Sequence, residues 1–65
     1  MYDVAVYDLV GRRVRSLASG RATAGRHIVD WDLHSDRGVA MPQGMYIIRI
    51  DIDGRDSARP VFVAR

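Results

Sequence analysis

The chain has 65 residues, which is enough for one small domain, and it has no cysteine to form a disulfide or a thiolate metal site. All ten basic residues are Arg and all eight acidic residues are Asp, so the net charge is only +2. The arginines are scattered instead of forming a stripe, which argues against nucleic-acid binding, and no apolar run is long enough to cross a bilayer. We treat residues 1–65 as a single domain.

Period-2 alternation dominates the chain and predicts strands from its start. Tyr2, Val4 and Val6 share one face of a first strand. Residues 8–11 form a turn, in which Gly11 is free to adopt a positive φ. A second strand over residues 13–17, with an inward side chain at Val14, completes a hairpin.

The middle of the chain predicts a third strand and two connections. Residues 18–25 and 33–38 are rich in turn formers and predict loops. Residues 26–32 predict a strand, with His27, Val29 and Trp31 on one face. Residues 39–41 form at most a short strand, which ends at a proline that cannot donate to a ladder.

The last third of the chain predicts the clearest hairpin. Residues 45–52 alternate strongly, with Tyr46, Ile48 and Ile50 facing one way. Asp53 and Gly54 are typical of a two-residue type I′ turn. A final strand over residues 57–64 contains Pro60, which predicts either an edge strand or a bulge.

Short strands separated by frequent turn signals predict an all-β fold, specifically an immunoglobulin-like β-sandwich with five to six short antiparallel strands. The inward positions of three of these strands give the expected core, and Phe62 is a further aromatic core candidate. The expected core residues are Val4, Val6, Val29, Trp31, Tyr46, Ile48 and Ile50.

Catalytic and metal sites are not expected. No nucleophile-elbow pattern surrounds a serine, and His27 alternates with apolar residues as a structural histidine does. Residues 32–38 place oxygen ligands at alternate positions, as calcium loops do, but they lack the glycine and glutamate that such loops require. We expect Asp32 and Asp36 to make local turn hydrogen bonds to backbone instead. The sequence therefore predicts no enzyme activity, no metal and no cofactor.

Three segments together resemble a known family. Residues 4–17 are similar to a "VxVYDxxGRxVRxL" hairpin, residues 24–32 to an "AGxHxVxWDG" strand, and residues 36–38 with 43–50 to a "DxxGxxxxxGxYxYRL" segment. The series resembles the immunoglobulin-like domain of the flagellar hook-capping protein (FlgD-type). Related modules end many exported proteins as type IX secretion C-terminal sorting domains.

The resemblance implies a non-catalytic C-terminal sorting or anchoring module of an exported bacterial protein, located in the periplasm, at the cell surface or outside the cell. It further implies that recognition lies in the terminal hairpin, where Arg59 takes the place of the family's basic residue. The expected recognition residues are Gly44, Tyr46, Arg49 and Arg59. It also implies that the chain lacks the one or two N-terminal strands with which the family normally begins.

Two alternative functions stay open: a structural assembly domain, as in a flagellar cap or surface filament, and a small carbohydrate- or ligand-binding domain that uses exposed aromatic residues. The expected partners are proteins, either the export machinery or a second copy. Because residues 27–31 lack a neighbouring strand, we expect a homodimer through that exposed strand edge.

Overall fold

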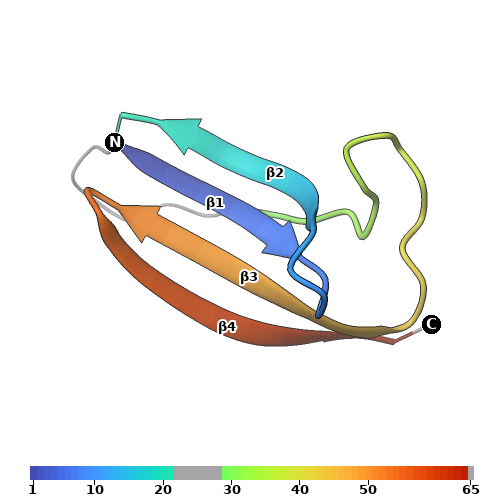
Figure 1. Ribbon diagram of the computed structural model, residues 1–65. Helices are drawn as coiled ribbons and strands as arrows, with labels where there is room; N and C mark the ends of the chain where they lie inside the picture. Colours follow the sequence, from blue (N-terminus) through green and yellow to red (C-terminus); the bar gives the residue numbers. More distant parts are fainter. Residues whose placement is uncertain (22–28, 65) are drawn as a thin grey trace.

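The computed structural model describes residues 1–21 and 29–64. These residues contain four strands, β1 (Tyr2–Tyr7), β2 (Arg13–Gly20), β3 (Gly44–Ile52) and β4 (Arg55–Val63), and no helix. All pairings are antiparallel, and the strands lie side by side in the order β2-β1-β3-β4 (Figure 1). The prediction of an all-β chain is confirmed, whereas the predicted count of five to six strands is not matched in the described part.

Two local turns form as the sequence predicts. Gly11 has a φ of 95° in the β1–β2 turn. Asp53 and Gly54 have φ values of 50° and 84°, and positive values at both central residues are what a type I′ turn requires. The β3–β4 ladder then runs without a register shift from Ile52↔Arg55 to Gly44↔Val63.

Two β-bulges in β2 direct its apolar residues to one face. The β1–β2 register shifts between Val4 and Ala5 and again between Val6 and Tyr7, which leaves Leu17 and Val14 as the extra residues of the two bulges. Strict alternation would place Val14 and Leu17 on opposite faces. With the bulges, both pack on the same core, Val14 as a buried member and Leu17 against it.

The core lies on the face of the sheet that carries Val6 and Tyr46, here called the inner face. Its buried residues are Val6, Val14, Tyr46 and Val63, and Val4 is buried as well. The segment 29–43, green to yellow in Figure 1, covers this core because Trp31, Leu33 and Met41 pack against it. Its cover reaches only one end of the inner face.

Several predictions for the middle of the chain are wrong. Residues 29–32 form no strand, and residues 26–28 of the predicted third strand lie outside the described residues, as does His27. Val29 is 40% exposed and does not belong to the core, while Trp31 and Ile48 are partly buried against it. In place of a strand over residues 39–41 there is one isolated bridge, between His34 and Ala40.

Of the remaining expected core residues, some are buried and others are partly or largely exposed. Val4, Val6 and Tyr46 are buried as predicted, and Ile50 is partly buried. Phe62 is 57% exposed, because it pairs with Met45 on the face opposite to the core.

Candidate functional site

The four expected recognition residues do not form one site. Tyr46 is buried in the core, with 5% of its surface exposed. Arg59 lies directly opposite Ile48, on the inner face, whereas Arg49 lies opposite Ala58, on the outer face. The two arginines therefore occupy positions on opposite faces of the sheet.

Gly44 and Tyr46 hold the corner that leads into β3. Gly44 has a φ of 153°, which few other residues adopt, and the Tyr46 hydroxyl donates a 2.7 Å hydrogen bond to the carbonyl oxygen of Pro42. The Tyr46 ring also contacts Trp31 edge-to-face, with the ring centroids 5.5 Å apart. Tyr46 therefore anchors this corner, and both residues have structural roles.

Arg49 is held in an ion pair on the outer face. Its Nη2 lies 3.0 Å from Oδ2 of Asp56, and this contact raises the pKa of the Arg49 guanidinium. Arg13 on β2 makes the equivalent outer-face pair with Asp3, at 2.9 Å. Both pairs are about half exposed, and such pairs contribute at most about 1 kcal/mol to stability.

The Asp8 side chain stabilises the β1–β2 turn. One carboxylate oxygen of Asp8 accepts hydrogen bonds from the backbone N–H groups of Val10 and Arg12, and the other accepts one from the Arg12 guanidinium at 2.9 Å. These donors, led by the backbone N–H of Arg12, hold the pKa of Asp8 below its usual range. The spacing of Asp8, Gly11 and Arg12 is therefore explained by the turn itself.

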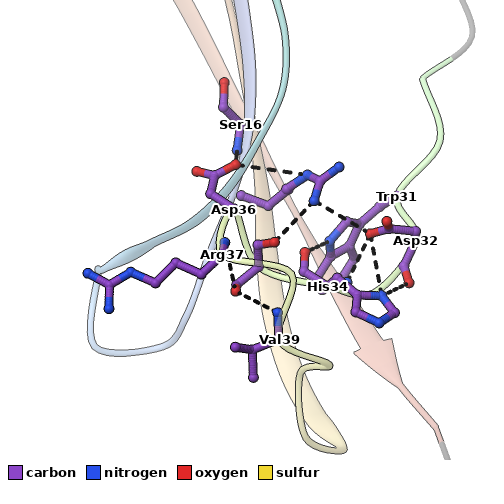
Figure 2. Close-up of polar contacts among 9 residues, drawn as sticks. Ser16, Trp31, Asp32, His34, Asp36, Arg37 and Val39 are labelled. Carbon is purple, nitrogen blue, oxygen red and sulfur yellow. Dashed lines mark hydrogen bonds and ion pairs between the residues drawn. The ribbon is translucent and has the colours of Figure 1, made fainter.

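A second polar cluster joins segment 29–43 to the free edge of β2 (Figure 2). Asp36 donates its backbone N–H to the carbonyl oxygen of Val14 and accepts the N–H of Ser16 on its Oδ1, at 3.0 and 3.1 Å. Arg15 adds a 3.1 Å hydrogen bond from Nη1 to the carbonyl oxygen of Ser35. Asp36 thus continues the ladder where a neighbouring strand would otherwise pair.

The other hydrogen bonds of this cluster join residues within segment 29–43 and fix the conformation of the loop. Asp32 accepts the N–H of His34 at 3.0 Å, while Trp31 donates its indole N–H to the His34 carbonyl oxygen at 2.9 Å. The hydroxyl oxygen of Ser35 accepts the N–H groups of Arg37 and Val39 (Figure 2). The local hydrogen bond expected for Asp32 is confirmed, whereas the one expected for Asp36 is not local, since its acceptor oxygen reaches β2.

Nothing in the described part of the chain suggests a metal centre, because its His and Asp side chains form no group of three that could share an ion. It also contains no helix that could cross a membrane.

An apolar groove lies on the inner face, beside the part that Trp31, Leu33 and Met41 cover. It has a volume of about 590 Å³. Its floor consists of side chains from three neighbouring strands, and Val29, Arg59, Pro60 and Val61 border it. The floor residues are Tyr2, Val4, Leu17, Ile48, Ile50 and Ile52. The sequence predicted the alternation that creates this face, but it could not show where the described part of the chain covers the face and where it leaves a groove.

Both free edges of the sheet carry features that discourage strand addition. The edge of β2 has two bulges and is capped by Asp36. On β4, Pro60 pairs with Ile47 in an uninterrupted ladder, so its nitrogen, which carries no hydrogen, must point away from β3. An added strand would find a donor missing there.

Comparison of the chain with protein-family models, with curated proteins and with solved structures finds no match.

Proposed function

We propose that the chain is a non-catalytic module that acts by presenting its folded surface to other proteins, as a sorting or anchoring domain of an exported bacterial protein. The observation that carries this proposal is the apolar groove on the inner face. A sheet normally buries its apolar face against a second layer, and the described residues 29–64 leave the part of this face that forms the groove without such a layer.

The resemblance to the FlgD-type and type IX sorting domains supports the export part of the proposal. Its "YDxxGR" segment corresponds to the turn closed by Asp8, and its "GxY" segment to the corner fastened by Tyr46. Both segments have the geometry that a shared hairpin framework would need. Resemblance in such positions speaks for a common scaffold, with recognition left to exposed residues.

The features of the two edges favour contact through the faces over assembly by strand pairing. Pro60, the bulges in β2 and the cap by Asp36 all discourage addition of a further strand. Ligand stacking is also less favoured, because Trp31 is partly buried and both its ring and its N–H have partners.

The test is delivery of a periplasmic reporter fused to residues 1–65 in a host with type IX secretion. We expect the reporter at the cell surface. Deleting residues 57–65 is a poor test of recognition because it removes Val63, a core residue that is 2% exposed. Arg49→Gln and Arg59→Gln are better, since both side chains are exposed.

The matched control is Arg13→Gln, which breaks an ion pair of similar length and exposure on the same outer face as Arg49. We expect surface delivery to fall for the variants at 49 and 59 and to persist for the variant at 13. A reporter that stays in the periplasm when fused to the unaltered module would refute the proposal. So would equal delivery by all three variants.

A further inference from the structure

The charged residues at the inner-face strand positions beside the groove are arginines. The ladder places Arg55 opposite Ile52 and Arg59 opposite Ile48, so both arginines occupy inner-face positions on β4. Arg59 borders the groove, and Arg55 lies beside Ile52 of its floor. Neither forms a salt bridge with any residue that the structure describes. The strand aspartates Asp3, Asp51 and Asp56 occupy outer-face positions, so this rim has no carboxylate within its own sheet.

This distribution of charge argues against a second copy as the occupant. If the inner faces of two copies packed together, arginines of one copy would face arginines of the other, because the inner-face positions of the four strands carry arginines and no aspartate. Like charges across a desolvated interface are unfavourable. The complementary occupant has apolar side chains for the floor and carboxylates for the β4 border.

The backbone of the occupant is also constrained. A single covering strand would need partners for its own N–H and C=O groups, and the sheet edges discourage it from pairing there. A helix satisfies these groups internally and packs on a sheet through one apolar stripe. An amphipathic helix therefore fits both the open face and the blocked edges.

We propose that the inner-face groove docks an acidic amphipathic helix of another protein, with its apolar stripe on the floor formed by Ile48, Ile50 and Ile52 and its carboxylates paired with Arg55 and Arg59. This inference rests on the proposed function and names the surface and the chemistry of the partner.

The probes are two labelled synthetic peptides, each about four helical turns long, with identical Leu and Ile stripes and either Glu or Lys along the flanks. Fluorescence anisotropy measures their binding to the 65-residue chain. The Glu peptide is expected to bind about tenfold more tightly than the Lys peptide, since two exposed ion pairs are each worth up to about 1 kcal/mol and 1.4 kcal/mol is a factor of ten. Added salt should reduce this difference.

The variant Arg55→Glu with Arg59→Glu should invert the preference between the two peptides. Among single variants, Arg59→Glu should reduce it, while Arg37→Glu, which reverses one exposed charge on segment 29–43, should leave it unchanged. Circular dichroism verifies that each variant is folded. Inversion by the double variant, with no effect of the variant at 37, supports the groove as the docking site.

Equal affinity for the two peptides, a preference that does not depend on residues 55 and 59, or no saturable binding would each overturn the proposal. Sedimentation supplies a further outcome: a dimer that Ile50→Asp dissociates while the chain stays folded would place a second copy in the groove and overturn it too. The reporter experiment separates this inference from the proposed function. Failed peptide binding with intact surface delivery refutes only the groove, and failed delivery with the expected peptide binding refutes only the sorting role.

Discussion

Replacing Tyr46 with Phe removes one hydroxyl and leaves the ring in place. The hydroxyl donates to the carbonyl oxygen of Pro42 at 2.7 Å in a partly buried setting, so the variant loses this hydrogen bond and leaves that carbonyl without its donor. Such a loss costs about 1 kcal/mol. A domain of this length has a free energy of unfolding of roughly 3–10 kcal/mol, and 1 kcal/mol lowers its melting temperature by about 4–8 °C.

Tyr46→Ala removes the ring as well. The ring belongs to the buried core and contacts Trp31 edge-to-face, so we expect a loss of about 3–5 kcal/mol, which approaches the whole stability of the domain. The two substitutions together separate the contribution of the corner hydrogen bond from that of core packing.

Urea unfolding followed by tryptophan fluorescence measures both effects, because Trp31 is the only tryptophan and its ring centroid lies 5.5 Å from that of Tyr46. The midpoint should fall in Tyr46→Phe with an unchanged slope. The control is Tyr7→Phe, which removes the hydroxyl of a partly exposed tyrosine that makes no side-chain hydrogen bond within the described residues. Equal midpoints for the two Phe variants would refute the role of the corner hydrogen bond.

Four further predictions concern the β1–β2 turn, the edge of β4, the loop that caps β2, and calcium. Because the pKa of Asp8 is lower in the folded chain than its usual value of about 4, its carboxylate stabilises the fold at pH values above about 4, and this stabilisation is lost as the pH falls through the lower pKa of the folded state. Asp8→Asn should therefore weaken the decrease in melting temperature at acidic pH, measured by thermal melts at a series of pH values. An unchanged pH profile would contradict the role of Asp8 in the turn. Pro60→Thr restores an outward N–H on β4 and should cause concentration-dependent association in sedimentation, whereas a strictly monomeric variant would show that proline is not what protects this edge. Asp36→Ala should lower the free energy of unfolding by about 1 kcal/mol, while Asp36→Asn keeps an acceptor for Ser16 and should lose less. Calorimetric titration with calcium should give no binding signal, and a saturable signal that Asp36→Ala abolishes would contradict this prediction.

Much of the local structure could be predicted from the sequence, because the signals involved are local. Alternation over two residues located all four strands to within a few residues at each end. Asp53 and Gly54 specified a type I′ turn because both tolerate a positive φ. Tyr46 fastens a corner through its hydroxyl. Pro60 is suited to an edge strand because it lacks an N–H.

The tertiary structure decided how these strands meet. The pairing of β1 with β3 joins segments about forty residues apart, and alternation by itself does not state which strands become neighbours. The bulges that turn Val14 and Leu17 to one face depend on the core they fill. The same holds for residues 29–32, which alternate as a strand does but have their hydrogen bonds in a loop that caps β2 and covers one end of the core.

The candidate site follows the same division. The family resemblance implied four recognition residues, among them Arg49 and Arg59. The register between β3 and β4 places these two arginines on opposite faces of the sheet, because neighbouring positions along a strand alternate between the faces. The open groove is likewise a property of what covers the inner face and what does not. The residue types determined that this face is apolar, and the tertiary structure decided that Trp31, Leu33 and Met41 cover one end of it while the groove lies at the other end among the described residues.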